Sequence, residues 1–243
     1  MKFKKAVLLA TTAIFVAYFG FVFATGNVEK ISLILLTRTL QKGKYVSVKG
    51  EVFYKVVGGK MVTHVTYPFE QVVITDASGE MKTYDFAQNA ISIEHADEYS
   101  SRNSFFYNFF EGNITDMGLP QLNFKLVSNK AEPPLLISEW QPKTLMNKGL
   151  QKIIVAHQNN LPVYMGFYNE KKMALQKIYY TNYQPVGNMM LPFNITEINY
   201  ENNGKDSIIT RRTYSDLKTN GEVSNKYFEF QIPSSAKLIE MPK

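Results

Sequence analysis

The residue types that most often carry chemistry are few in this sequence and widely separated. The three histidines, His64, His95 and His157, lie far apart, and none belongs to an HExxH motif. The chain has no cysteine, which removes thiol nucleophiles, thiolate metal sites and disulfides. We therefore interpret the histidines as ordinary surface or core residues, and we expect no metal site and no cofactor.

Short catalytic motifs are equally weak. Residues 234–237 read Ser-Ser-Ala-Lys, which fits the SxxK pattern, but the companion SDN and KTG elements are missing. A polar turn after Pro233 is the better interpretation. The sequence also lacks the GxSxG, GxxxxGK[ST] and GxGxxG motifs. These observations predict no catalytic residues and favour a protein that is not an enzyme.

Neighbouring charged residues do not suggest a site either. Asp97 and Glu98 are adjacent in sequence, whereas acid–base catalysis needs carboxyl groups that face each other across a cleft. We assign them to a helix N-terminus, where acidic side chains suit the helix dipole. Arg211 and Arg212 make too short a run for nucleic-acid binding, and we interpret them as residues on the solvent-facing side of a strand.

The informative feature is the apolar content. Aromatic residues make up 14% of the chain and there are ten methionines, which is more than a thin sheet needs to stay folded. One cluster stands out, because its aromatic residues fall within six positions. It contains Phe105, Phe106, Tyr107, Phe109 and Phe110. A short helix with apolar residues on more than one side predicts a lid, formed by the four phenylalanines, that faces either its own sheet or a ligand.

The elements around this cluster are predicted to be mostly strands. Residues 28–42 are the exception, because their apolar side chains recur at spacings of three to five and predict a helix that ends at Gly43. Runs of period two then follow at 44–56, 60–67, 71–75, 81–86 and 90–94. The turn residues between these runs predict a hairpin and then a meander within one continuous antiparallel sheet.

The second half of the chain continues this pattern after one interruption. Residues 96–117 are helix-like and contain the aromatic cluster. Strand-like runs resume at 121–128, 134–140, 151–157, 162–168, 174–182, 191–200, 206–214 and 226–232. About a dozen strands with two helical interruptions predict a mainly β (α+β) fold. We expect a strongly curved antiparallel sheet, or an unclosed β-barrel, with helices covering the concave face.

Alternation along the first strands selects the side chains that face the concave side. One face of each run is apolar and the other is polar and faces solvent, so the apolar face is expected to line a lipid-binding cup. The predicted cup residues are Val46, Val48, Val52, Tyr54, Met61, Val65, Val72 and Ile74.

The N-terminal segment has the composition of an export signal. Lys2, Lys4 and Lys5 precede an uncharged stretch at residues 6–24, which ends in a small residue. We expect cleavage after Ala24. The alternative is an uncleaved membrane anchor, because the apolar stretch exceeds about 15 residues, the usual length in a signal peptide.

Residues 25–243 are then expected to form a single domain. Three of the six net positive charges belong to the N-terminal lysines, and the remaining charge of about +3 is too small to suggest nucleic-acid binding. We expect a monomer in the periplasm of a Gram-negative cell.

Three stretches of the sequence point to a known family. They are GEVFYK at 50–55, YPFEQVVITDASGEMKTYDF at 67–86 and NKYFEFQIPSSAKLIE at 225–240. These stretches resemble the periplasmic carrier that moves lipoproteins to the outer membrane (LolA-like, LolA/LolB superfamily). The helix expected at 28–42 falls where that family has its first helix, and the likeness covers about a third of the chain.

The resemblance implies an unclosed β-barrel whose apolar concave face, covered by helices, accepts the acyl chains of a lipoprotein. It also implies an inner-membrane release complex and an outer-membrane acceptor as partners. Related members use the same cup for glycolipids or for envelope-stress signalling, so the fold does not name the cargo. The family carrier has an arginine beside a proline after the strand matching 50–55, thought to latch the lid. Residues 56–59 of this chain read Val-Val-Gly-Gly, so no latch carries over.

Three classes of function follow from these expectations. The first is a carrier of lipid or lipoprotein acyl chains. The second is a sensor or protein-interaction module of the cell envelope, with the same half-barrel and the N-terminal run kept as an anchor. The third, held as the least favoured, is an enzyme acting on envelope lipids or glycans.

Overall fold

The computed structural model describes residues 27–96, 99–144 and 149–239, and its strands form one sheet of fourteen. The spatial order is β14-β6-β5-β4-β3-β2-β1-β13-β12-β11-β10-β9-β8-β7. Its first half comprises β1 (Lys30–Gln41), β2 (Lys44–Lys55), β3 (Met61–Tyr67), β4 (Gln71–Thr75), β5 (Glu80–Asp85) and β6 (Ala90–His95). Its second half comprises β7 (Phe124–Glu132), β8 (Leu135–Pro142), β9 (Leu150–Gln158), β10 (Leu161–Asn169), β11 (Ala174–Val186), β12 (Met189–Glu201) and β13 (Asp206–Thr219).

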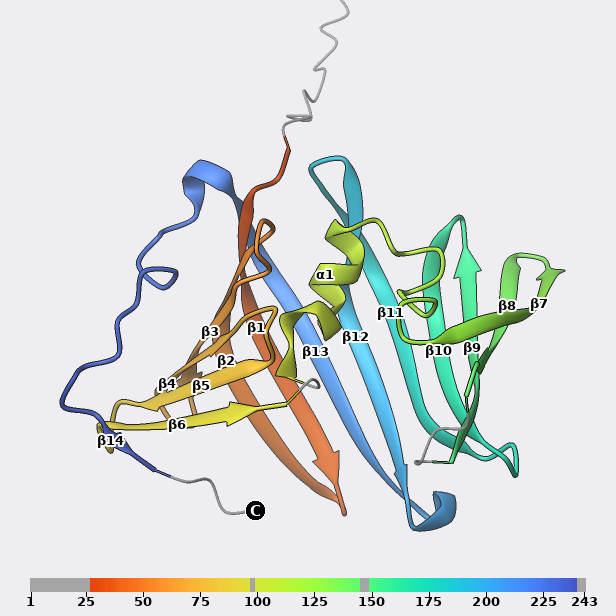
Figure 1. Ribbon diagram of the computed structural model, residues 1–243, viewed down its shortest axis with the longest axis horizontal. Helices are drawn as coiled ribbons and strands as arrows, with labels where there is room; N and C mark the ends of the chain where they lie inside the picture. The colour runs from red at the N-terminus through yellow and green to blue at the C-terminus, as the bar shows by residue number, and fades with distance from the viewer. Residues whose placement is uncertain (1–26, 97–98, 145–148, 240–243) are drawn as a thin grey trace, which may run out of the picture.

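The sheet is antiparallel throughout, apart from the short strand β14 (Lys237–Leu238), which runs parallel to β6 at one edge. The sheet curves strongly, and its concave side holds the helix α1 (Phe105–Phe110), as Figure 1 shows. The expected curved, unclosed sheet is therefore confirmed. Gly58 and Gly59 make the turn of the predicted β2–β3 hairpin, both with positive φ, and the predicted β3–β6 meander follows.

The helix predicted at 28–42 is wrong, because these residues form β1. This strand lies near the middle of the sheet, between β2 and β13. Ile31, Ser32 and Leu33 are consecutive and all buried, so both faces of the strand are covered at that end. A strand buried on both faces loses the alternation of a half-buried strand, and its apolar residues then fall at helix-like spacings by chance.

The segment between β6 and β7 is less helical than predicted. It contains a single turn of 3₁₀-helix (Ser101–Asn103) and the six-residue α1, followed by turns that lead into β7. Ser104 caps α1, because its Oγ accepts a hydrogen bond from the backbone N–H of Tyr107 at 3.2 Å. The cap fixes where the helix begins, inside the curve of the sheet.

The strand predicted at 226–232 is also wrong. These residues make turns and extended backbone along the convex side of the sheet, where the blue C-terminal segment runs in Figure 1. Local hydrogen bonds satisfy part of the backbone, including Glu229 N–H to the Asn225 carbonyl at 3.0 Å. The segment is held by its aromatic side chains instead of by strand pairing.

Two apolar clusters stabilise the fold, one on each face. The larger fills the concave side and joins α1 to strands from both halves of the sheet. The smaller lies on the convex side, where Phe53, Val62, Val72 and Val223 are buried, with Tyr227 among the aromatic residues packed against them. The convex face of the first strands is therefore covered by the C-terminal segment.

Within the described ranges, no helix combines the length and the hydropathy that a membrane crossing requires. The expected signal peptide at 1–24 lies outside the described residues, as do Asp97 and Glu98.

Candidate functional site

A cavity of about 1300 Å³ lies between the concave face of the sheet and the segment that contains α1. It is larger than the roughly 300–1,000 Å³ of most small-molecule pockets. Apolar side chains from both halves of the sheet line it, including Val52 and Met61 on one side and Ile153, Ile178 and Ile195 on the other. The concave side is therefore partly filled by protein and partly open to a guest.

Helix α1 occupies the centre of this concave side. Phe106 stacks on Tyr54 with ring centroids 5.5 Å apart, and Phe110 stacks on the same tyrosine at 5.5 Å. Phe109 lies against Tyr180, from the other half of the sheet, at 6.4 Å. The helix therefore bridges the two halves through its aromatic side chains, each pair adding about 0.5–1.5 kcal/mol beyond simple burial.

The four predicted lid residues all belong to this cluster. Phe106 and Phe109 are buried, whereas Phe105 and Phe110 are half-buried. Phe105 and Phe106 also line the cavity, and Phe105 lies 5.3 Å from the ring of Tyr214. Two of the four predicted lid residues therefore border the cavity, whereas Phe109 and Phe110 are not among its lining residues.

Three of the predicted cup residues belong to the cavity or its aromatic wall. Val52 and Met61 line the cavity, and Tyr54 packs against α1. Val46 and Val48 share a face with Val52 by alternation along β2 but lie farther along the strand, where Val46 is 58% exposed.

The other predicted cup residues divide between the two faces. Val65 shares the face of Met61 by alternation along β3 and is half-buried. Val72 and Ile74 do not face the cavity, and this part of the prediction is wrong. They pack on the convex side, in the cluster of Phe53 and Val223. Thr63 of β3 lines the cavity and pairs with Val73 of β4, so Val72 and Ile74, on either side of Val73, face the opposite side of the sheet.

Residues 99–117, which contain α1 and are called the lid segment below, are tied at their beginning to the turn between β4 and β5. The backbone N–H of Ser101 donates to the Asp76 carbonyl at 2.8 Å, and Ser100 Oγ donates to the Ala77 carbonyl at 3.1 Å. The Asp76 carboxylate in turn accepts from the backbone N–H of Ser78 at 2.8 Å and from its hydroxyl at 2.5 Å. These bonds lower the pKa of Asp76, the hydroxyl of Ser78 being the largest cause.

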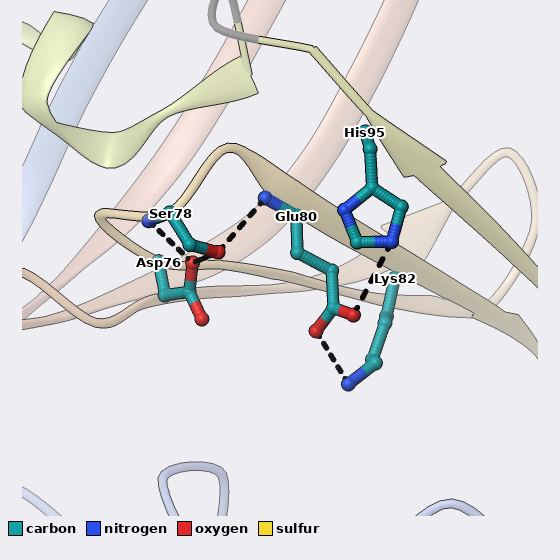
Figure 2. A network of polar contacts seen from close by, with 5 residues as sticks. All are labelled: Asp76, Ser78, Glu80, Lys82 and His95. Carbon is teal, nitrogen blue, oxygen red and sulfur yellow. Dashed lines mark hydrogen bonds and ion pairs between the residues drawn. The ribbon is translucent and has the colours of Figure 1, made fainter.

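Figure 2 shows that this turn continues into a charged network on β5 and β6. Glu80 contacts Lys82 at 2.5 Å and His95 at 3.6 Å. Exposed ion pairs of this kind contribute little to stability. The attachment of the lid segment to this turn therefore rests on the hydrogen bonds to the Asp76 and Ala77 carbonyls.

The far end of the lid segment is held by His157 of β9. Its Nε2 donates to the Ile114 carbonyl at 2.8 Å, and the ring is buried. This contact agrees with the interpretation of His157 as a structural residue. Leu119 is fully buried nearby in sequence, and its carbonyl accepts from the backbone N–H of Phe124 at the start of β7.

The turn between β2 and β3 lies close to the start of the lid segment. Gly59 has φ +62°, and a Cβ added there would lie 3.0 Å from Ser101 Oγ. Gly58 has φ +83° with open space around it. The backbone of this turn therefore approaches the start of the lid segment closely at Gly59.

One charged pair lies in the cavity and was missed by sequence reasoning. Arg212 of β13 and Glu197 of β12 form an ion pair through Nη1 and Oε1, and both line the cavity. The interpretation of Arg211 and Arg212 as solvent-facing is therefore correct only for Arg211, which is exposed. Alternation along 206–214 was the available signal, because two consecutive residues of a strand must face opposite ways.

Burial shapes the protonation of the groups around this pair. Burial alone would lower the pKa of Arg212, but the Glu197 carboxylate outweighs it and the pKa is raised. Burial raises the pKa of Tyr180, with a further contribution from Glu197. Burial also raises the pKa of Tyr214. The wall thus contains an ion pair of zero net charge, Arg212 with Glu197, flanked by two tyrosines whose hydroxyl groups keep their protons.

The sequence matches no family model and no curated protein. The fold, by contrast, is found in solved structures. A DUF1329 family protein from Desulfovibrio piger matches with a TM-score of 0.56 and 12% identity, over 84% of this chain and 91% of that one. A LolA superfamily protein from Nitrosomonas europaea matches at 0.55 and 14%, over 82% and 90%.

A putative outer membrane lipoprotein-sorting protein domain from Vibrio parahaemolyticus matches at 0.55 and 14%, over 82% of this chain and 89% of that one. The resemblance to the LolA superfamily drawn from the sequence is thereby confirmed at the level of the fold. At such low identity the likeness defines a half-barrel class and not an activity.

Proposed function

We propose that the protein is a non-catalytic carrier of the periplasm, which binds acyl chains of a lipoprotein or lipid and delivers them toward the outer membrane. The observation that carries the proposal is the apolar cavity of about 1300 Å³ beneath a short aromatic helix. Partners on either side would be an inner-membrane release complex and an outer-membrane acceptor. Fold neighbours of the lipoprotein-sorting class support this proposal.

The energetics explain why the cavity contains protein side chains. Burying an acyl chain contributes about 0.8 kcal/mol per methylene, so a sixteen-carbon chain gains on the order of 12 kcal/mol. A carrier that bound so tightly would not release its cargo. Phe105 and Phe106 line the space that the chain would enter. A guest that takes their place must displace them, and this competition lowers its net affinity.

Analysis of bound lipid tests this proposal. The full chain is purified from native periplasm and membranes without detergent, extracted with organic solvent, and analysed by mass spectrometry. We expect acyl-containing species at about one per protein. The matched control is Thr63→Trp, which adds bulk to a residue that lines the cavity and should purify with much less lipid.

The opposite result has a definite meaning. Lipid-free protein in both preparations would contradict the carrier proposal. If the lipid-free protein also retained its first 24 residues, the carrier proposal would give way to the alternative of an anchored interaction module.

A further inference from the structure

The wall that carries Arg212 and Glu197 is otherwise apolar or aromatic. Arg212 pairs across the strands with Ile195, and Glu197 pairs with Ile178. Both isoleucines line the cavity, as does Tyr214. The side chains of Arg212 and Glu197 keep 35% and 20% of their surface accessible. The ion pair is thus a polar spot within an apolar wall.

Such a pair is not needed to hold two strands together. Removing two charges from water costs about as much as their attraction returns, and apolar residues of similar volume often serve stability as well or better. A guanidinium has five N–H donors, and the contact with Glu197 through Nη1 engages only part of them. The remaining N–H groups of Arg212 can donate to a ligand atom that accepts hydrogen bonds.

The charge of the cavity decides which acceptor fits. Its charged lining residues are two arginines, Arg102 and Arg212, and two glutamates, Glu111 and Glu197, so the formal charges cancel. An ionised carboxylate placed beside Arg212 would meet the Glu197 carboxylate at short range on a half-buried wall, which is unfavourable. An ester or amide carbonyl can accept from the guanidinium without adding charge.

We infer that the Arg212–Glu197 pair is a polar subsite on the β12–β13 wall of the cavity and selects acyl chains that end in a neutral ester or amide carbonyl over ionised fatty acids. The inference rests on the proposed function, because it names the class of acyl ligand that the same cavity takes. Glu197 acts as the discriminating residue, since it supplies the negative charge that excludes carboxylates.

Competition binding tests the inference with ligands of one chain length. A neutral fluorescent alkane is bound to the full-length protein and displaced with methyl laurate, lauramide or laurate at pH 8, well above the ordinary carboxyl pKa of about 4. We expect the ester and the amide to displace the probe at roughly tenfold lower concentration than laurate. Glu197→Gln should reverse the preference, because Arg212 then lacks its counter-charge.

Two further variants separate the subsite from general effects. Replacing both residues of the pair with methionine should weaken displacement by the ester and the amide, which lose the guanidinium donors, while the chain still binds. Arg211→Met is the matched control, because the side chain is exposed and its Nε donates to Thr196 Oγ1. It removes an arginine one position away and should leave the preference for ester over carboxylate unchanged.

The outcomes distinguish the two proposals. Equal potency of methyl laurate and laurate on the unmodified protein overturns the subsite, while displacement itself keeps the carrier proposal. An unchanged preference in folded Glu197→Gln protein overturns it too. If none of the three ligands displaces the probe, the carrier proposal fails and takes the subsite with it. The measurement on the unmodified protein decides the matter even if a variant does not fold.

Discussion

Arg211 and Arg212 show how much a single position matters on a strand. They are adjacent in β13, yet Arg211 is exposed and Arg212 lines the cavity beside Glu197. Sequence spacing cannot predict that Arg212 pairs with Glu197, because Glu197 belongs to the neighbouring strand β12. Period-two alternation could have separated the two arginines, but only strand pairing reveals the counter-charge.

Gly59 provides a prediction at the same scale. Gly59→Ala should lower the free energy of unfolding by roughly 1–2 kcal/mol, because the new Cβ meets Ser101 Oγ at 3.0 Å and φ is positive. Part of this cost should disappear in a Ser101→Ala background. Ser101 Oγ is buried and has no hydrogen-bond partner among the described residues, so that background should itself be close to neutral.

Urea unfolding of the four proteins in this double-mutant cycle measures the coupling. Gly58→Ala serves as a control, since its Cβ would enter open space and its cost should not depend on Ser101. Additive effects of Gly59→Ala and Ser101→Ala would show that the turn does not press on the start of the lid.

Among the elements, β1 and the C-terminal segment show where local patterns mislead. The apolar residues of β1 recur at helical spacings, but pairing with β2 and β13 on either side determines its conformation. Residues 226–232 alternate like a strand, and instead pack Tyr227 and Phe230 onto the convex face. In both cases long-range contacts outweigh intrinsic preference.

The lid helix carries a prediction about binding and release. Changing Phe106 and Phe109 together to alanine should raise the affinity for an acyl chain and slow its transfer to acceptor vesicles, because the chain no longer competes with protein side chains for the cavity. Both side chains are buried, so the variant should also lose several kcal/mol of stability, on the order of 3–5 for each ring. Fluorescence binding and vesicle transfer assays give the two quantities.

Two controls make this test robust. Phe69→Ala removes an aromatic residue that is 68% exposed and should change neither quantity. Phe105→Ala affects a half-buried residue that lines the cavity, so it should act in the same direction at lower cost in stability. Unchanged affinity and unchanged transfer in folded double-variant protein would count against competition by the lid.

At the scale of the whole molecule, the cluster on the convex face stabilises the sheet without lining the cavity. Phe53 is 2% exposed on the convex side and lies 4.9 Å from the ring of Tyr227. Phe53→Ala should lower the free energy of unfolding by roughly 3–5 kcal/mol and leave acyl-chain affinity unchanged in the folded protein. Thermal unfolding and competition binding check the two parts, and a matching loss of affinity would contradict this separation of the convex cluster from the cavity.

The sequence was a good guide to the sheet and a partial guide to the cavity. Alternation and turn residues predicted β2 to β6 closely, and the aromatic run predicted the helix that enters the concave side. Val72 and Ile74 were assigned to the wrong face, because β4 has apolar residues on both faces and only the pairing of Val73 with Thr63 shows which face is concave. The residues of β9 to β13 that line the cavity were not predicted. They approach the first strands only because the whole sheet curves, and local patterns do not show this.

Trp140 allows the central claim to be measured directly. It is the sole tryptophan of the chain, it is buried in the concave cluster, and it pairs across the strands with Ile153, which lines the cavity. Addition of a brominated acyl ester should quench its fluorescence saturably at about one ligand per protein, whereas iodide in solution should quench it weakly. Absence of saturable quenching by the brominated chain, with the protein folded, would contradict the account of this cavity as an acyl-chain site.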